Sequence, residues 1–445
     1  MSITYKPSMF NYICDKADDI LIYNSYIGIK SVTRISSKRK EEVLSALKGE
    51  FLSCSEDVLN VLFSRGFLVD EKVNEIYKRN ALYSKYINGN TLLLVIHTTK
   101  KCNFRCPYCN LDYPNEELSM EAEEGIEKFV QRNLVKYSDV QIDWFGGEPT
   151  LNIDKISRLS EKLIGYCRRV HKPFRATITT NGYLLQPKNV KLLIDANVKV
   201  FSITVDGLPD THNKQRVLAN GGATHSTIIE NLLYIRDHIK NHDVRIVIRT
   251  NITKTIMSQI DQYYAYYNDM FGNDSRFSLL VRPAENIGGE RVDTLNGEFL
   301  TQSEYNDVLL RLSKIVRNDG IQFANNFEDL DPCGFSCPAI LANKYTIGVD
   351  GGVSKCDAIF PEAQIGYLSK DGTLHFEGAS TEEDWIAGCF KEQPECDKCF
   401  FSVCCFKESC PLDRLRGGEF KCHLDTTEID ANLLLYAATH DLVTI

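Results

Sequence analysis

Three cysteines stand close together in the stretch Cys102-Asn-Phe-Arg-Cys106-Pro-Tyr-Cys109. Thiolates bind the irons of [4Fe-4S] clusters, and the C-x3-C-x2-C spacing lets one short loop hold three of the four irons. The fourth iron is left without a protein ligand, so it can chelate a small molecule through an amine and a carboxylate. The motif therefore predicts an iron-sulfur centre that activates a small co-substrate, with a zinc site as the alternative.

Cysteines also gather in the last part of the chain. The sequence holds 16 in all, far more than packing requires, and the N-terminal stretch MSITYKPSMF lacks the apolar segment of a secretory signal. In a reducing compartment such a number favours metal or iron-sulfur ligation over disulfides, so we expect a cytoplasmic protein. The cysteines of this region are Cys333, Cys337, Cys356, Cys389, Cys396, Cys399, Cys404, Cys405, Cys410 and Cys422.

Further polar and glycine-containing motifs follow apolar runs. Gly146-Gly-Glu-Pro149 contains two glycines that let backbone approach a ligand closely, and its glutamate is a charged acceptor suited to an ammonium group. Thr180-Asn-Gly182 and Ser202-Ile-Thr-Val-Asp-Gly207 stand at the ends of two later runs. Arg216 lies ten residues beyond Asp206, and its guanidinium suits bidentate binding of a carboxylate.

Alternating strands and helices must position these motifs. The first helix has Ile126, Phe129, Val130 and Leu134 on one stripe, as a helix that covers a sheet should. The predicted strands are Leu92–His97, Val140–Phe145, Arg175–Thr180, Val198–Val205, Val244–Thr250 and Phe277–Arg282. The predicted helices are Ser119–Val135, Ile153–Val170, Lys188–Ala196, Ser226–Ile239 and Ile256–Phe271.

Repeated βα units require a parallel sheet, and six such strands indicate a partial (βα)6 barrel of the TIM type. Chemistry in such barrels takes place at the C-terminal ends of the strands. The cysteine motif follows the first predicted strand, and the motifs at 146–149 and 180–182 follow the second and third. We therefore expect the motifs to meet at one edge of the sheet.

The motif CNFRCPYC, with GGEP, TNG and Arg216 in register, resembles the signature of radical S-adenosylmethionine (SAM) enzymes. The resemblance implies that Cys102, Cys106 and Cys109 hold a [4Fe-4S] cluster that binds SAM. Thr204 stands where related enzymes often carry a serine that contacts the ribose, and Arg216 matches an arginine that meets the SAM carboxylate. The cofactor-binding residues so implied are Tyr108, Gly146, Gly147, Glu148, Asn181, Thr204 and Arg216.

The C-terminal cysteines resemble the SPASM extension, which binds two auxiliary [4Fe-4S] clusters and would bring the total to three. Cys404 and Cys405 compete for one ligand role, because the gap before Cys410 is one residue longer than usual. The spacing from Cys333 to Cys337 is shorter than that of the corresponding cysteines in sulfatase maturases. Without Cys333 as a ligand, one iron would be open to a substrate thiolate. The implied ligands are Cys333, Cys337, Cys356 and Cys410 for the first cluster, and Cys396, Cys399, Cys405 and Cys422 for the second.

For the remaining thiols, at Cys14, Cys54, Cys167 and Cys389, we expect buried or idle roles. A zinc-stabilised tail is the alternative to the auxiliary clusters. Asp357 follows Cys356, as an aspartate does in sulfatase maturases, where it deprotonates the substrate. It is a candidate catalytic base here, with a plain turn residue as the alternative.

The first 88 residues indicate a separate module. Asp19–Thr33 predicts two strands about a turn at Asn24–Ser25, Lys38–Leu47 and Ser55–Ser64 predict helices, and Phe67–Val69 predicts a closing strand. This order resembles the winged-helix-like peptide-recognition domains of peptide-modifying radical SAM enzymes, which accept a leader peptide by strand addition. A packing module without a ligand is the alternative. The division predicted is 1–88 for this domain, 89–315 for the barrel and 316–445 for the SPASM domain.

The function implied is that of a peptide maturase. Such an enzyme abstracts a hydrogen atom from a ribosomally made precursor peptide and installs a thioether or carbon-carbon crosslink, with electrons from a donor such as flavodoxin or ferredoxin. An anaerobic sulfatase maturase that forms formylglycine is the alternative enzyme. An iron-sulfur electron carrier or a zinc-stabilised adaptor is the alternative outside enzymes.

Charge and hydropathy exclude some partners. The net charge of -9 argues against broad binding of nucleic acid or anionic membranes. No apolar run approaches the roughly 20 residues that a bilayer-spanning helix needs. We expect neither a nucleic-acid nor a membrane partner.

Overall fold

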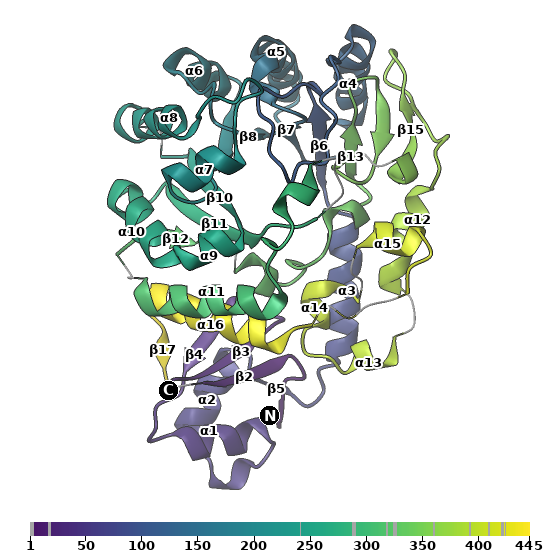
Figure 1. Ribbon diagram of the computed structural model, residues 1–445. Helices are drawn as coiled ribbons and strands as arrows, with labels where there is room; N and C mark the ends of the chain where they lie inside the picture. The colour runs from purple at the N-terminus through teal and green to yellow at the C-terminus, as the bar shows by residue number, and fades with distance from the viewer. Residues whose placement is uncertain are drawn as a thin grey trace.

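Six parallel strands, paired in chain order, form the centre of the computed structural model (Figure 1). The structure describes residues 4–16, 19–240, 242–286, 291–316, 319–323, 327–358, 361–390, 393–407, 410–419, 422 and 424–445. Each predicted strand is present within two residues of its expected bounds, and the α/β fold class is confirmed. The strands are β6 (Thr91–His97), β7 (Asp139–Phe145), β8 (Phe174–Thr180), β9 (Val198–Thr204), β10 (Arg245–Ile252) and β11 (Phe277–Pro283).

Helices cover the outer face of these strands, as the βα periodicity predicts (Figure 1). The predicted stripe of the helix α4 (Met120–Asn133) is buried, with Ile126 and Val130 fully enclosed. The predicted helix Ile256–Phe271 is instead two helices, because the chain closes a turn at Gln259, whose N–H donates to the carbonyl of Ile256. The helices are α4 (Met120–Asn133), α5 (Ile153–Arg169), α6 (Pro187–Asp195), α7 (Pro209–Gln215), α8 (His225–His238), α9 (Lys254–Ser258), α10 (Ile260–Phe271) and α11 (Gln302–Ile315).

The sheet extends beyond the six strands at both edges. β12 (Gln322–Phe323) pairs parallel with β11, and β13 (Lys344–Ile347) pairs parallel with β6. An antiparallel meander of β14 (Gly352–Ser354), β15 (Gln364–Leu368) and β16 (Leu374–His375) continues from β13. The cysteine-rich segment therefore shares one 11-stranded sheet with the barrel. Its short helices are α12 (Glu382–Ile386), α13 (Pro394–Asp397), α14 (Ser402–Cys405) and α15 (Pro411–Leu415).

The N-terminal module has the predicted hairpin, two helices and closing strand. Ser55 caps the second helix by accepting a hydrogen bond from Val58 N, as a helix N-cap does. Two further strands, β1 and β2, precede the predicted ones, and the stretch before the barrel is a helix. The elements are β1 (Tyr5–Pro7), β2 (Asn11–Lys16), β3 (Asp19–Asn24), β4 (Gly28–Arg34), α1 (Lys40–Leu47), α2 (Glu56–Ser64), β5 (Leu68–Asp70) and α3 (Glu75–Ile87).

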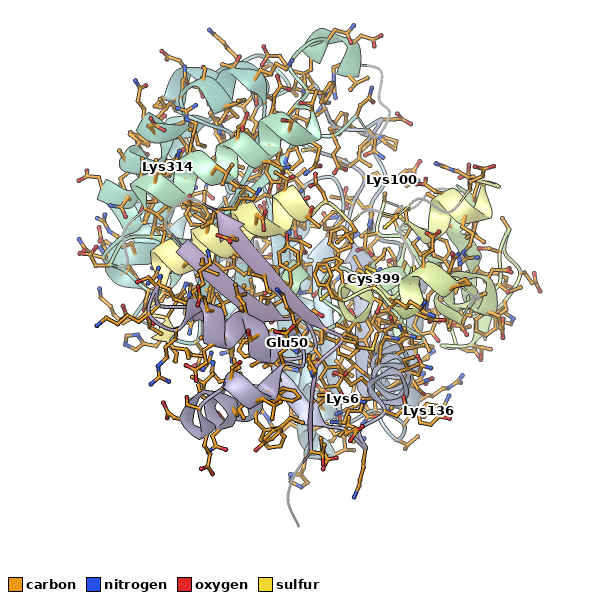
Figure 2. All side chains as sticks on the ribbon, turned by 90° about the horizontal axis from the view of Figure 1, so that it is seen from below. Lys6, Glu50, Lys100, Lys136, Lys314 and Cys399 are labelled. Atoms are coloured by element: carbon orange, nitrogen blue, oxygen red, sulfur yellow. The ribbon has the colours of Figure 1, made fainter. Side chains whose placement is uncertain are left out.

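The last residues of the sequence return to this N-terminal module. Helix α16 (Thr426–Thr439) packs against α11 and also contacts β2 and β4, and Figure 2 shows it crossing the N-terminal strands. It leads into β17 (Val443–Thr444), which pairs parallel with β4 in a sheet of order β17-β4-β3-β2. Residues 316–445 thus contribute strands to the 11-stranded sheet and to the four-stranded sheet, and the division at residues 88 and 315 stays a prediction.

Within the described ranges, no helix combines the length and the apolar character needed to cross a bilayer.

Candidate functional site

The three cysteines of the C-x3-C-x2-C motif line one cavity of about 370 Å³ at the C-terminal ends of the barrel strands. Their loop follows β6 and is tied to the chain beyond α7, because Arg105 N donates to Val217 O at 2.9 Å. Burial raises the pKa of Cys102 to about 12 and that of Cys106 to about 11. Both free thiols are therefore protonated at neutral pH, and binding of iron would release their protons.

The two glycines after β7 hold this loop in place. Gly147 N donates to Thr99 O and the next amide donates to Lys101 O, both at 2.8 Å. A Cβ added at Gly146 would lie 2.4 Å from Thr99 O, and one at Gly147 would lie 2.1 Å from Lys101 O. The two glycines thus allow a close approach of two backbone segments, which sets the position of the cysteines, and their contact with a ligand stays a prediction.

Glu148 joins the ends of two neighbouring strands. Its side chain is buried, and Oε1 accepts from Thr150 N at 3.0 Å and from Thr180 Oγ1 at 2.6 Å. Among the described residues, Oε2 accepts only from Asn181 N, at 2.7 Å, so it can accept from a further donor. Burial raises the pKa of Glu148, while these hydrogen bonds oppose the shift. Asn181 in turn donates from Nδ2 to Asn103 Oδ1 in the cysteine loop at 2.8 Å.

A triad of the half-buried Tyr108 with the buried Asp206 and Arg216 closes another side of the cavity. The Tyr108 hydroxyl donates to Asp206 Oδ2 and accepts from Arg216 Nη1, and Arg216 Nη1 lies 3.7 Å from Asp206 Oδ2. Burial opposes the charge of Arg216, but Cys106, Tyr108 and Asp206 raise its pKa well above the ordinary value. Thr204, at the end of β9, lines the same cavity. Sequence reasoning missed Asp206, although its place directly after a barrel strand could have indicated it.

Asp357 comes to this cavity from the cysteine-rich segment. Its Oδ1 accepts from Lys344 Nζ and from Thr346 Oγ1, the latter at 2.8 Å, and both donors lie on β13. Its backbone carbonyl lies 2.9 Å from His97 Nε2, at the end of β6. Burial lowers the pKa of His97 to about 4, so this ring is neutral at pH 7 and donates to the carbonyl. Neither Lys344 nor His97 belongs to a sequence motif.

The auxiliary cysteines fall into two groups. Burial raises the pKa of Cys337 to about 11, and the charge of a Cys410 thiolate would raise it further. Burial likewise raises the pKa of Cys356, again with a contribution from Cys410. These three thiols are therefore neighbours. A second group of mutually interacting thiols consists of Cys396, Cys399, Cys405 and Cys422.

Cys333 lies in a small apolar cluster, and its role as a ligand stays a prediction. It packs among Tyr83, Ile87, Ile340 and Phe406, and burial alone raises its pKa to about 12. Burial raises the pKa of Tyr86, and the charge of Cys333, together with that of Cys337, contributes to the shift. In the part of the chain that the structure describes, no three His, Cys, Asp or Glu side chains are arranged to hold a single metal ion.

The adjacent residues Cys404 and Cys405 have different neighbours. Cys404 is fully buried, with its Sγ 3.6 Å from the Tyr23 hydroxyl and 3.9 Å from Ser25 O in the N-terminal module. Cys405 instead faces the second group of thiols. Cys14 and Cys167 are buried and Cys54 is half-buried, while the side chain of Cys389 lies outside the described residues.

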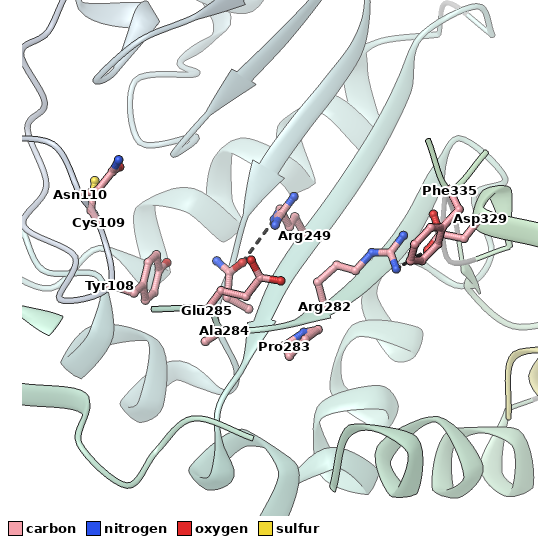
Figure 3. Close-up of a pocket in the computed structure, with 11 residues that line it drawn as sticks. Tyr108, Cys109, Asn110, Arg249, Arg282, Pro283, Ala284, Glu285, Asp329 and Phe335 are labelled. Atoms are coloured by element: carbon pink, nitrogen blue, oxygen red, sulfur yellow. Dashed lines mark hydrogen bonds and ion pairs between the residues drawn. The ribbon is translucent and has the colours of Figure 1, made fainter. Parts of the chain in front are cut away.

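A second cavity, of about 530 Å³, adjoins the first (Figure 3). Tyr108, Cys109 and Asn110 line both cavities, so the cysteine loop is the wall between them. Its other walls come from the ends of β10 and β11 and from the segment that follows β12. None of the predicted site residues other than those of the cysteine loop lies here.

Comparison with known proteins finds a family match for the central part of the chain. Residues 96–257 match the model of the radical SAM superfamily. The chain is 22% identical over 346 residues to the cysteine-type anaerobic sulfatase-maturating enzyme of Clostridium novyi, covering 70% of this chain and 86% of that one. It is 26% identical over 210 residues to the radical SAM cyclopropyl synthase TigE of Paramaledivibacter caminithermalis, covering 42% and 43%. Fe-coproporphyrin III synthase of Methanosarcina barkeri is 30% identical, but the match spans only 29% of its length and 28% of this chain.

Solved structures share the fold. The structure of anSMEcpe with bound AdoMet superposes with a TM-score of 0.59 at 17% identity, covering 79% of this chain and 93% of the other. The same enzyme with bound AdoMet and Kp18Cys peptide gives a TM-score of 0.58 at 18% identity, covering 78% and 96%. At these identities the likeness shows a common fold over most of both chains.

Proposed function

We propose that this chain, whose residues 96–257 form a radical SAM domain, is a peptide maturase that abstracts a hydrogen atom from a ribosomally made precursor peptide and installs an intramolecular thioether or carbon-carbon crosslink. The observation that carries the proposal is the meeting of the cysteine loop, Glu148 and Arg216 in one cavity beside a larger one. The first cavity suits a small co-substrate. The second leaves room for a peptide side chain next to it.

The residues of the first cavity fit a [4Fe-4S] cluster with SAM. The cluster and SAM, when bound, supply a 5'-deoxyadenosyl radical that removes a hydrogen atom from a substrate. Cys102, Cys106 and Cys109 would hold the cluster. Buried Arg216 has an Nε without a hydrogen-bond partner among the described residues, as expected of a group that awaits an anion such as the SAM carboxylate.

The remaining predicted residues would contact different groups of SAM. Glu148 Oε2 would accept from the ammonium group, and Thr204 would meet the ribose. Gly146, Gly147 and Asn181 would act through the cysteine loop, which they hold by packing and hydrogen bonding. Tyr108 would shield the site, since its ring lies between the two cavities. Holding both reactants in fixed positions away from water is what the chain itself contributes.

Asp357 is proposed as the base. Its Oδ1 is held by Lys344 and Thr346, and its Oδ2 is left to accept a proton from a substrate residue in the first cavity. Proton removal by a positioned carboxylate accompanies the oxidation of a carbon-centred substrate radical to form a new bond, with an auxiliary cluster, when bound, as the electron acceptor. The donors on β13 would keep this oxygen in one place during the reaction.

The cysteine-rich segment is proposed to hold two auxiliary [4Fe-4S] clusters. Cys396, Cys399, Cys405 and Cys422 supply four neighbouring thiols for one of them. Cys337, Cys356 and Cys410 supply three for the other, and the place of Cys333 is the weak point of its predicted set. An external electron donor such as flavodoxin or ferredoxin would complete the system. A zinc-stabilised tail stays the alternative.

A sulfatase maturase is the second candidate. The place of Asp357 in the first cavity favours it, as does the alignment with the C. novyi enzyme over 86% of that protein. The two candidates are separated by incubating the reconstituted enzyme and SAM with a sulfatase-derived peptide and, separately, with a cysteine-containing precursor peptide. Formylglycine in the first peptide would support the maturase of sulfatases, and loss of two hydrogen atoms from the second would support the crosslinking enzyme.

The experiment that tests the radical SAM assignment measures iron, sulfide and SAM cleavage after anaerobic reconstitution. The wild type should bind about 12 irons per chain, and the triple variant Cys102→Ala, Cys106→Ala, Cys109→Ala should bind about eight and cleave no SAM. Cys54→Ala, at a half-buried thiol of the N-terminal module, is the matched control. Zinc in place of iron, or a fully loaded protein that leaves SAM intact, would move the protein to the carrier or adaptor class.

A further inference from the structure

The second cavity contains two arginines that face the barrel interior. In the parallel register Asn251 pairs with Arg282, while Arg249 pairs with Thr204, which lines the first cavity. Paired residues in a sheet point to the same face, so these side chains all project inward. Figure 3 shows Arg249 and Arg282 entering the space between the cysteine loop and Phe335.

The two arginines differ in how their charge is compensated. Arg282 Nη1 forms an ion pair with Asp329 Oδ2 at 2.7 Å. Arg249 donates from Nε to Asn251 Oδ1 at 3.3 Å, and among the described residues neither of its terminal nitrogens has a hydrogen-bond or ion-pair partner. Burial lowers the pKa of Arg249, and the neighbouring charge of Arg282 lowers it further. Tyr108, Asp206 and Glu285 oppose this pKa shift without forming a hydrogen bond to the terminal nitrogens of Arg249. A half-buried guanidinium in this position leaves two parallel N–H donors unused.

The balance of charge in the cavity restricts which anion fits. Its charged lining residues are Arg249, Arg282, Asp329 and Glu285, so the cavity is formally neutral. A single carboxylate would give the terminal nitrogens of Arg249 a hydrogen-bonding partner at the cost of one added charge, whereas the several charges of a polyphosphate would be repelled by Asp329 and Glu285. A carboxylate also matches the fork of a guanidinium through two parallel hydrogen bonds. These features favour a carboxylate over a nucleotide.

We propose that Arg249 binds a carboxylate of the peptide substrate and so determines which residue is presented to the radical. The proposal rests on the proposed function, which it deepens by naming an acidic peptide as the substrate class. The carboxylate lies either on an aspartate or glutamate side chain or at the C-terminus of the peptide. Because the cysteine loop separates the two cavities, a residue held by Arg249 stands next to the first cavity, where SAM would be cleaved.

The test is affinity selection with the reconstituted holoenzyme and SAM. Three pools of N-acetylated random octapeptides serve as probes: amidated peptides without aspartate or glutamate, amidated peptides with them, and peptides without them that end in a free carboxylate. The variants are Arg249→Gln, Arg249→Lys and the matched control Arg245→Gln, which changes an exposed arginine of the same strand. GTP binding and SAM binding are measured in parallel.

The wild type and Arg245→Gln should enrich one of the two carboxylate pools, and the pool enriched identifies the source of the carboxylate. Arg249→Gln should bind the enriched peptides about tenfold to hundredfold more weakly than the wild type does, because a charge-assisted hydrogen-bonded pair is lost. The affinity of Arg249→Lys should lie between those of the wild type and Arg249→Gln. Equal recovery of all pools, recovery of none, or enrichment that survives Arg249→Gln would overturn the proposal. The proposal would also be overturned if Arg249→Gln lost affinity for SAM in parallel, or if GTP were the ligand whose binding this variant lost. Failure of the wild type to cleave SAM would instead refute the proposed function.

Discussion

Lys344 donates a hydrogen bond from Nζ to Oδ1 of Asp357, and the two side chains differ sharply in exposure, at 2% and 46%. Lys344 lies on β13, which pairs parallel with the first barrel strand. A buried cation on a rigid strand thus fixes a half-exposed carboxylate at the cavity of the cysteine loop. Burying a charge costs free energy unless it is paired, so the two residues depend on each other.

This pairing predicts unequal effects of two substitutions. Asp357→Asn should lower product formation by about 10² to 10⁴-fold, as expected when a general base is removed. Lys344→Met should lower it by about tenfold to hundredfold, since it removes one charge-assisted hydrogen bond from the base. Product formed per SAM cleaved is measured with a peptide that the wild type modifies. Lys370→Gln, at an exposed lysine of the same segment, is the control, and full activity of Asp357→Asn would exclude its role as the base.

A single methyl group should displace the cysteine loop. Gly147→Ala would place a Cβ 2.1 Å from Lys101 O, so the loop must shift at a cost of about 1 to 3 kcal/mol. We expect a loss of iron from the first cluster and of SAM cleavage. Gly165→Ala in α5 is the matched control, because its added Cβ meets no atom within 4 Å and alanine favours a helix. Equal iron contents in both variants would show that the loop tolerates the shift.

Neighbouring cysteines should behave differently on substitution. Cys405→Ser should reduce the iron content from about 12 to about eight per chain, since this thiol faces the second auxiliary group. Cys404→Ser should keep all its iron, because that thiol contacts Tyr23 in the N-terminal module. Iron and sulfide analysis after identical reconstitution measures both. The reverse result would assign the ligand role to Cys404.

The N-terminal module should become less stable when the side chain of Ile445, which follows β17, is replaced. Ile445 N donates to Arg34 O at 2.9 Å, and its side chain, 8% exposed, packs in the core formed by α1 and α2. Ile445→Asp should destabilise this contact by about 3 kcal/mol, because it removes apolar burial and introduces a charge. Faster hydrogen exchange of the β4 amides is the expected signal. Val443→Asp, at a side chain that is 47% exposed, should leave exchange unchanged.

Stability should fall in mild acid because of a buried histidine. Burial lowers the pKa of His225 to about 4 from 6.5. The contribution of the neutral His225 ring to the free energy of unfolding is fully present above pH 6.5. It is lost as the pH falls toward 4, because the unfolded chain takes up a proton at a higher pH than the folded chain does. This loss amounts to about 3 kcal/mol at most. Thermal midpoints between pH 7 and 4.5 should fall less steeply in His225→Gln, whereas His238→Gln, exposed on the same helix, should follow the wild type.

Local patterns in the sequence determined the barrel and the place of its first site. Apolar runs separated by amphipathic helices predict six parallel strands, and the βα order forces their C-terminal ends to one edge. The cysteine loop, Glu148 and Arg216 follow those strands, so their meeting could be predicted without coordinates. The turn at Gln259 could not, because it interrupts a stretch whose residues all suit a helix.

Only the tertiary structure decided the features that depend on long-range pairing. The register of β13 beside β6 brings Lys344 to Asp357, and that of β10 beside β11 brings Arg249 to Arg282. Two further contacts join residues that are far apart in the chain: β17 pairs with β4, and Cys404 contacts Tyr23. No residue type or spacing near these positions encodes the partner. Such contacts are selected by the packing of the whole chain, because their free energy is gained only after the distant elements have met.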